Sequence, residues 1–500
     1  MKRTIKKLYP FAIAIALTAT ACKKEYLETS PTSSIDANEV FTTTDGAMVA
    51  LNGTIRSMYS SLTNHGNFGQ KSYDLVLDLM GEDMVVHKQG YGWLNTDYNY
   101  SAPSNANPDQ RPDRTWFYYY RIISNANRII DGLDEAIGSE EDKASIRGQA
   151  LALRAHSYFY LVNFFGHNSL SGAGVPLYTE PTSEGNPRSS VQEVYNLIFS
   201  DLSEAETLLE GKSRIHRSHV DLAVAQGIHA RAALQIGNYD AALEYATKAI
   251  ESSGLSLYTA QQHTAAGFNT LSAPEWLWGL EVIVDQATIF ASFYSHIDNR
   301  EATGGYAALG TQKKITKALY DRIPEGDVRR NLFNGSQNPD LPIYSQVKFQ
   351  LRQPGNWASD YLLMRLAEMY LIKAEAEARL GNAAQATETL QTLVSTRYPA
   401  YNAGAFSGNA LLEEILLQRK IELWGEGFGL LDVKRLGNGL NRPTGDGNHG
   451  GGDLNSDANA ANFAPGELVL PANTNRWLFA IPQDEINANG ALTAADQNPQ

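Results

Sequence analysis

Cysteine is nearly absent from this chain, because Cys22 is the only one in 500 residues. One thiol excludes an internal disulfide and any zinc site built from several cysteines. The ten histidines show neither a His-x-x-x-His nor a His-Glu-x-x-His spacing, and no Walker-type glycine-rich motif is present. Zinc catalysis is therefore not indicated, nothing points to a phosphate-binding loop, and we expect neither a metal nor a cofactor.

Positive charge is also scarce. The chain has 41 lysines and arginines against 55 aspartates and glutamates, a formal net charge of −14. An acidic protein repels a phosphate backbone and anionic lipid headgroups, which argues against nucleic acid as a partner. No stretch after the first apolar run is long enough to cross a membrane, which takes about 20 apolar residues. Any attachment to a membrane is therefore expected to come from a lipid anchor alone.

The N-terminal segment has the layout of a secretory signal peptide. Residues 1–7 are basic, residues 8–17 are almost wholly apolar, and small residues precede Cys22. A small-x-small-Cys ending resembles a bacterial lipobox, although Ala19 stands where leucine is preferred. We predict that residues 1–21 are removed, that Cys22 is lipidated, and that residues 22–36 form a polar tether. The alternative is an ordinary cleaved signal with a cysteine nearby by chance.

Helical periodicity dominates the next part of the chain. Apolar residues recur every three or four positions over residues 114–137, 142–166 and 191–210. Two further segments, 223–250 and 361–394, have matching offsets of small and apolar residues. These are Ala230, Gly237, Tyr239, Ala242, Ala246 and Ala249 in the first, and Ala374, Gly381, Ala383, Ala386, Leu390 and Leu393 in the second. This spacing resembles the tetratricopeptide repeat, and other helices are expected to fill the stack between the two units.

The stretch between these two units has a different character. Residues 275–284 and 343–351 have strand-like composition, and residues 476–482 predict a last short strand. Residues 437–465 are dense in glycine, asparagine and aspartate, which indicates a loop. We therefore predict a mainly α fold: tetratricopeptide-like helix pairs form a scaffold, and a loop-rich ligand-binding region contains a few short strands.

Four groups of segments together resemble the SusD/RagB-like lipoproteins of Bacteroidetes outer membranes. They are the lipobox with its tether "YLETSP"; "RGQALALRAHSYFYLVNFFG" with "GVPL"; "DYLLMRLAEMYLIKAEAEARLGN" with "ILLQRKIELWGEGFGLLDVKRLG"; and "FAIPQDEINANGALTAADQNP". Their order and spacing cover nearly the whole chain. One departure is visible, because Phe428-Gly429 follows Glu-Gly where the family often has a basic or bulky polar residue.

The resemblance implies one SusD-like domain over residues 37–500, with variable inserts at about 60–110 and 255–355. It implies a lipid-anchored protein on the outer face of the outer membrane. It also implies a SusC-like TonB-dependent transporter as partner, to which the protein delivers an oligosaccharide without catalysis. Three alternatives stay open: the same role with peptide cargo, a secreted carbohydrate-active hydrolase, and a periplasmic helical-repeat scaffold.

Glycan binding needs flat aromatic faces for sugar rings and polar groups for hydroxyls. Residues 87–109 offer four such rings and several amides in a segment without helix or strand periodicity. The ligand-binding candidates here are Tyr91, Trp93, Asn95, Tyr98 and Tyr100. We expect at least one of these rings to bind ligand, Trp93 first. The alternative is that the rings pack onto the body and tie the segment down.

A second aromatic segment follows the predicted strand at 275–284. Its candidates are Phe293, Tyr294 and Tyr306, with Phe290 and His296 nearby. Ligand binding and covering of the core are equally compatible with this position. The remaining large aromatic residues fit helical or strand faces, and we expect them to be structural. They are Trp116, Tyr158, Trp276, Trp278 and Trp424.

Charged clusters allow two interpretations. One cluster comprises Arg419, Glu422, Glu426, Asp432, Lys434 and Arg435. Helical spacing with basic partners nearby indicates a structural salt-bridge network rather than catalysis.

Glu82-Asp83 could supply one carboxylate of a glycosidase, which needs a second one across the bond. "DLNSD" at 453–457 opens like a calcium loop, but it lacks the following glycine and the later glutamate, so a polar loop is expected.

Overall fold

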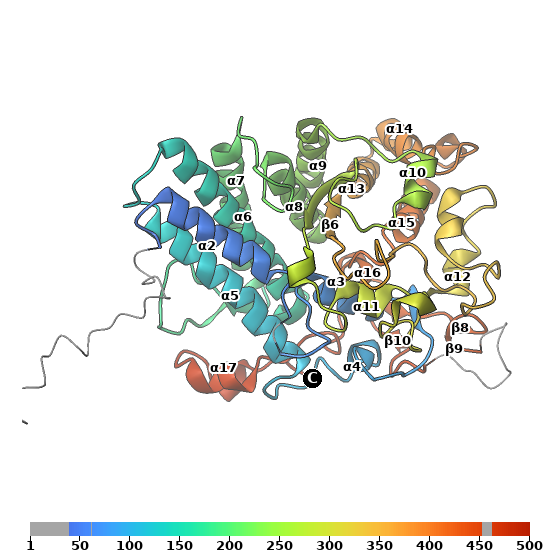
Figure 1. Cartoon of the computed structure of the whole chain (residues 1–500), viewed down its shortest axis with the longest axis horizontal. Helices are drawn as coiled ribbons and strands as arrows, with labels where there is room; N and C mark the ends of the chain where they lie inside the picture. The colour runs from blue at the N-terminus through green and yellow to red at the C-terminus, as the bar shows by residue number, and fades with distance from the viewer. Residues whose placement is uncertain (1–39, 62, 453–462) are drawn as a thin grey trace, which may run out of the picture.

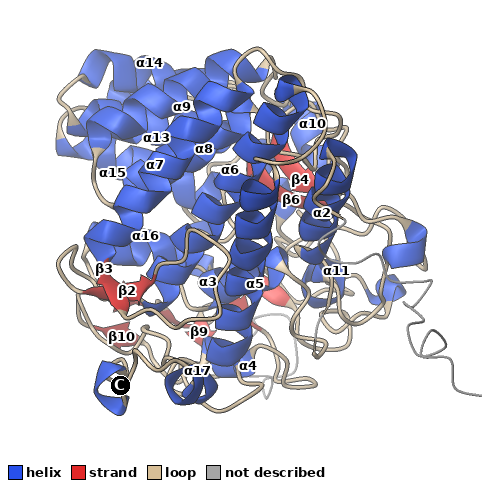
Figure 2. Cartoon of the chain, turned by 90° about the vertical axis from the view of Figure 1, so that its left-hand side faces the viewer, coloured by secondary structure: helices blue, strands red, loops and turns tan. Residues whose placement is uncertain are grey.

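The computed structural model describes residues 40–61, 63–452 and 463–500. The predicted signal peptide, Cys22, the tether and the "DLNSD" segment lie outside these described residues. Helices dominate one end of the molecule, and loops with most of the short strands occupy the other, whereas one strand pair lies among the helices (Figure 2). The predicted mainly α fold with a loop-rich region and a few short strands is confirmed.

Helices occur from the N-terminal to the C-terminal part of the described chain (Figure 1). They are α2 (Thr44–Ser57), α3 (Gln70–Leu79), α4 (Asn95–Tyr98), α5 (Arg111–Gly132), α6 (Glu140–Phe165), α7 (Val191–Leu209), α8 (Leu222–Gln235), α9 (Tyr239–Ser253), α10 (Ala260–Ala265), α11 (Phe293–Ile297), α12 (Lys317–Tyr320), α13 (Leu366–Arg379), α14 (Ala383–Val394), α15 (Asn409–Glu422), α16 (Gly429–Leu436) and α17 (Gln483–Ala488).

Small residues explain how the helix pairs pack. Ala242, Ala246 and Ala249 of α9 are fully buried, as is Ala230 of the partner helix α8. Gly237 turns the chain between them at φ +73°, a conformation that glycine adopts without strain. The pair α13 and α14 repeats this arrangement. The predicted helix pairs are thus confirmed, but no other helix separates them, because α9 packs directly against α13.

The strands pair two at a time. They are β1 (Met84–Val86), β2 (Ala173–Pro176), β3 (Arg188–Ser190), β4 (Trp276–Leu280), β5 (Lys313–Ile315), β6 (Tyr361–Arg365), β7 (Leu440–Asn441), β8 (Thr444–Gly445), β9 (His449–Gly450) and β10 (Val469–Leu470). The pairs are β1–β5, β2–β3, β4–β6, β7–β10 and β8–β9, and only the last is parallel. The predicted strand at 275–284 is confirmed in shortened form as β4.

Two predicted strands are wrong. Residues 343–351 form only isolated bridges, at Ser345 and Gln346, because this segment turns at Tyr344 with φ +70°. Residues 477–482 are buried, but their backbone hydrogen-bonds to segments that are not strands. Phe479 N donates to Phe164 O at 2.9 Å, and Ala480 N donates to Pro103 O at 2.7 Å. The strand-like composition of this segment therefore reflects the burial of its side chains and not pairing in a β-sheet.

A buried ion network joins β4, β6 and the C-terminal end of α15. Arg365 is fully buried, and its Nη1 lies 2.7 Å from Glu275 Oε1 and 2.6 Å from Glu422 Oε1. Its Nη2 lies 2.8 Å from Glu426 Oε1. Arg397 Nη2 contacts the same two carboxylates, Glu275 at 2.8 Å and Glu422 at 3.0 Å. Each buried charge therefore has a partner, as it must in a region without water.

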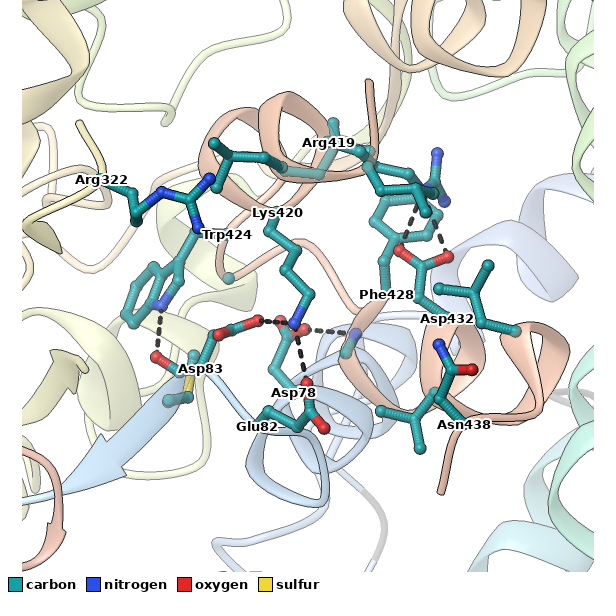
Figure 3. Close-up of a pocket in the computed structure, with 18 of the residues that line it drawn as sticks. Asp78, Glu82, Asp83, Arg322, Arg419, Lys420, Trp424, Phe428, Asp432 and Asn438 are labelled. Atoms are coloured by element: carbon teal, nitrogen blue, oxygen red, sulfur yellow. Dashed lines mark hydrogen bonds and ion pairs between the residues drawn. The ribbon is translucent and has the colours of Figure 1, made fainter. Parts of the chain in front are cut away.

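The predicted salt-bridge cluster at 419–435 is confirmed except at Lys434, whose ammonium donates to Asn163 O instead of to a carboxylate. Asp432 accepts from Arg419 Nε at 2.9 Å (Figure 3). It also accepts from Arg435 Nε at 2.7 Å. Arg435 also reaches Glu375 of α13 at 2.7 Å. The predicted structural roles hold for the large aromatic residues as well, all of which are buried. These are Trp116, Tyr158, Trp276, Trp278 and Trp424.

The network predicts a specific acid sensitivity. Burial alone would raise the pKa of Glu422, but Arg397 and Arg365 outweigh it and hold the pKa well below the ordinary 4.5. Its ionised form therefore stabilises the fold above about pH 4.5, and this stabilisation is lost as the pH falls through the lower folded-state pKa. We expect the loss of unfolding free energy in Glu422→Gln to be constant from about pH 7 to 5 and to shrink below that.

Urea unfolding at several pH values measures this difference. Glu251→Gln, on an exposed position of α9, is the matched control and should show no such trend. A cost for Glu422→Gln that stays constant down to about pH 3 would contradict the assignment.

Candidate functional site

Five rings from three separate segments meet at the loop-rich end of the molecule. They are His65, Tyr91, Trp93, Phe290 and Tyr306, which we call the aromatic platform. Tyr306 is its centre, with ring centroids 5.2 Å from Tyr91, 5.2 Å from Phe290 and 6.0 Å from Trp93. His65 stacks on Phe290 at 5.7 Å and lies 5.6 Å from Trp93. The two aromatic segments predicted independently from the sequence are therefore brought together.

Hydrogen bonds hold the platform in place. His65 Nδ1 and the Tyr306 hydroxyl lie 2.6 Å apart. Tyr306 N donates to Ser295 Oγ at 3.2 Å, which fixes the segment on α11. Arg111, at the start of α5, donates to Gly66 O at 3.2 Å next to His65. Since a ring held in one orientation loses little entropy when a ligand binds, the platform is preorganised.

The platform exposes apolar surface to solvent. Tyr91 is 67% exposed and Phe290 is 40% exposed, whereas Trp93 is half-buried and Tyr306 is buried beneath them. Two aliphatic side chains from the same segments, Ile289 and Leu309, are also exposed. Exposed aromatic side chains gathered in one place mark a binding surface more often than a chance arrangement.

Three candidates from residues 87–109 lie away from this surface. Tyr98 is fully buried, and its hydroxyl lies 2.7 Å from His449 Nδ1. Tyr100 is also fully buried, and its hydroxyl donates to Met80 O. The Arg442 guanidinium lies against both rings, at 4.9 and 5.2 Å. Asn95 is buried and its amide donates to Gln89 O at 2.8 Å. These side chains tie the segment to the core, so we leave them out of the proposed ligand site.

Two candidates from the second segment are also buried. The Phe293 ring faces Lys71 Nζ at 4.7 Å. The Tyr294 hydroxyl lies 2.6 Å from Phe268 O and 2.8 Å from Asp360 O, and these two carbonyl oxygens share its one proton. Both side chains belong to α11 and are buried in the core, where they support the segment that carries Tyr306. We therefore leave them out of the ligand site as well.

The sequence argument missed His65. This histidine lies in the mostly polar stretch "SSLTNHGNF", which has no periodicity and only one other ring, Phe68. Its role depends on contacts with Phe290 and Tyr306, more than 200 positions away. No local signal could have indicated it.

A separate cavity of about 410 Å³ lies between α3, α15 and α16 (Figure 3). Lys420 Nζ lies on its floor, 2.8 Å from Glu82 and 3.2 Å from Asp83. Burial raises the pKa of Asp83, and the Lys420 ammonium opposes that shift. Trp424 Nε1 donates to Asp83 O at 3.0 Å. The lysine thus bridges two carboxylates adjacent in the chain, an arrangement that ties α15 to the turn before β1.

Metal ligation finds no support in the described part of the chain. No group of three or more histidine, cysteine, aspartate or glutamate side chains there is placed to hold a metal ion. Among the helices of residues 40–61, 63–452 and 463–500, none is both long and apolar enough to cross a membrane.

The fold and the platform define a class of protein: a helical-repeat scaffold that presents a cluster of partly exposed aromatic side chains on loops. Comparison with known proteins identifies the family. Residues 25–234 match the family model described as "Starch-binding associating with outer membrane", and residues 344–500 match the model of the SusD family. The chain belongs to the SusD/RagB family.

Known proteins of similar sequence or structure match this chain over most of its length. A SusD-like carbohydrate binding protein from Bacteroides vulgatus ATCC 8482 is 29% identical, with a TM-score of 0.78 over 92% of this chain and 98% of that one. A putative sugar binding protein from the same organism is 26% identical, with a TM-score of 0.76 over 92% and 98% of the two chains. SusD-like protein P38 from Formosa agariphila is 26% identical over 85% of this chain and 90% of its own length.

Proposed function

We propose that this protein captures an oligosaccharide at the aromatic platform and delivers it to a SusC-like TonB-dependent transporter. The observation that carries the proposal is that exposed Tyr91 and Phe290 and half-buried Trp93 gather around Tyr306. Pyranose rings have apolar faces, and aromatic side chains supply large contact areas at low conformational cost. Relatives of similar fold carry names that specify carbohydrate or sugar binding, which supports the same ligand class.

Attachment to the outer membrane forms the second part of the proposal. Lipidation of Cys22 after removal of residues 1–21 would anchor the protein, and residues 22–36 would tether the body on the exterior face. The family model's description, which includes association with the outer membrane, supports this location. A protein held beside its transporter works at high effective concentration, so modest affinity is enough.

Catalysis plays no part in the proposed function. A glycosidase needs two carboxylates facing one bond. Glu82 and Asp83 instead share the ammonium of Lys420 on one side of their cavity. The alternative is that the protein has the same role in capture and delivery but binds a peptide. It predicts retention of peptides and indifference to glycans.

One assay tests capture against catalysis. The mature protein in detergent is run through gels containing polysaccharides, and released sugars are measured in the same samples. We expect retention by at least one neutral polysaccharide without release of shorter sugars. Release of shorter sugars would contradict the proposal and favour a hydrolase. Retention by immobilised peptides alone would support a role in nutrient capture but with a peptide as the ligand in place of an oligosaccharide.

A further inference from the structure

A second groove runs along α5, outside the aromatic platform. It has a volume of about 840 Å³ and lies between α5, the loop at 178–185 and α17. Both views place α17 beside the N-terminal end of α5 (Figures 1 and 2). The lining on α5 extends from Asp113 to Arg128, which is about 22 Å at 1.5 Å per residue. The groove is therefore long enough for an extended chain molecule.

Aromatic side chains form a continuous row at the bottom of this groove. Trp116 and Tyr120 lie 4.7 Å apart between ring centroids, and Tyr120 lies 5.8 Å from Tyr178. Phe117, one position along α5, is 56% exposed. Trp116 Nε1 donates to Glu485 Oε2 at 3.3 Å, which connects this row to α17. Trp116 is buried, so the surface open to a ligand comes from Phe117, with the Arg121 guanidinium 5.8 Å from its ring centroid, and from half-buried Tyr120 and Tyr178. Such a surface suits the apolar face of a flat ligand.

Polar groups of both kinds surround this row. The carboxylates are those of Asp113, Glu180, Glu184, Asp484 and Glu485, and the guanidiniums are those of Arg121 and Arg128. Across the described ranges, none of these seven side chains takes part in a salt bridge. Burial raises the pKa of Asp113, and the Asp484 carboxylate adds to the shift while a hydrogen bond from Asp109 N opposes it. Asp113 and Asp484 are thus close enough to interact electrostatically.

This lining selects a class of ligand. Sugar hydroxyls both donate and accept hydrogen bonds, so they can use carboxylates and guanidiniums alike. Five carboxylates against two guanidiniums repel an anionic glycan, such as a sulfated or uronic-acid polymer. A basic peptide would meet Arg121 and Arg128 along the floor.

We infer that the groove between α5 and α17 is a second saccharide-binding site, which takes a neutral glycan chain. This inference rests on the proposed function, because it gives the captured polysaccharide a second point of attachment. The first turn of α5 contacts both the aromatic platform and the groove. Arg111 holds the platform through Gly66, and Asp113 lines the groove. A polysaccharide bound at both sites is retained by avidity, which a short oligosaccharide cannot use.

Affinity gel electrophoresis with the mature protein in detergent tests this inference. The probes are amylopectin, xylan and galactomannan, their tetrasaccharides as competitors, and oligolysine as the peptide probe. We expect Phe117→Ala and Asp484→Ala to weaken retention by the recognised polysaccharide roughly tenfold or more. Trp93→Ala with Phe117→Ala should abolish the retention that remains in Trp93→Ala alone. Ile215→Ala, which removes an exposed side chain outside both sites, should change nothing.

The outcomes separate the groove from the platform. Polysaccharide retention that depends on Trp93 but not on Phe117 or Asp484 overturns the groove and leaves the proposed function standing. Binding of oligolysine that Asp484→Ala removes and salt weakens overturns the saccharide assignment in favour of a basic peptide. Retention by none of the neutral polysaccharides overturns both sites together. Because Phe117 and Asp484 are exposed, neither variant should disturb folding.

Discussion

Replacing Arg365 with methionine is expected to lower the free energy of unfolding by about 3–5 kcal/mol or more. The guanidinium contacts Glu275, Glu422 and Glu426, all buried away from water. Methionine fills part of the volume but leaves three carboxylates with fewer cations. Removing one partner of a buried ion pair leaves an uncompensated charge, whose desolvation cost exceeds the value of the pair itself.

Urea unfolding monitored by circular dichroism measures this loss. Lys248→Met is the matched control, because Lys248 and Glu244 form an exposed pair on α9 and their separation should cost only about 0.5 kcal/mol. Adding Glu275→Gln to Arg365→Met should recover part of the lost stability, since it removes one buried negative charge and leaves Arg397 to compensate Glu422. A cost for Arg365→Met no larger than that of the control would show that the network contributes little.

The network also supports the aromatic platform. Lys348 Nζ donates to Glu422 O at 3.0 Å and Trp424 O at 2.8 Å, which fixes the segment before Phe349. The Phe349 ring packs against Phe293 of α11 at 5.2 Å. Because α11 holds the segment of Tyr306, the buried charges and the exposed platform are parts of one packed unit. A variant that breaks the network is therefore expected to weaken ligand binding indirectly.

The helical scaffold could be predicted because its signal is local. Alanines spaced along one face allow close helix packing, and a glycine at the turn gives φ +73° at Gly237 and +83° at Gly381. The cluster around Asp432 was visible for the same reason, since its members lie within about five turns of helix. Arg365, Arg397 and Glu275 were not visible as a network, because they come from segments far apart in the sequence.

The platform could be predicted only in part. Residues 91–100 contain four rings of similar local context, yet two face solvent and two face the core. The backbone decides this, because Leu94 and Tyr100 adopt φ values of +65° and +63° on either side of the short helix α4. The buried pair then packs against Arg442, a partner more than 300 positions away. Composition identifies a ring-rich segment, whereas only the fold shows which rings remain exposed.

Trp93→Ala is expected to weaken binding of the captured glycan by about 2 kcal/mol, which is roughly 30-fold in Kd. Trp93 is half-buried between exposed Tyr91 and the core of the platform, and it contacts both His65 and Tyr306. A ring held on one side and open on the other loses little freedom when a sugar stacks on it. Isothermal titration with the oligosaccharide identified by gel retention gives the Kd directly.

Two substitutions at Tyr91 show whether the ring itself is responsible. Tyr91→Phe keeps the aromatic face, which is 67% exposed, and should bind nearly as well as the unmodified protein. Tyr91→Ala removes that face and should weaken binding, though less than Trp93→Ala, because an exposed side chain carries less binding energy than a desolvated one near the centre of a site. Unfolding free energies close to that of the unmodified protein would assign the loss to the surface. Equal binding by all three variants would place the glycan elsewhere, and the groove along α5 would then be the only candidate proposed above.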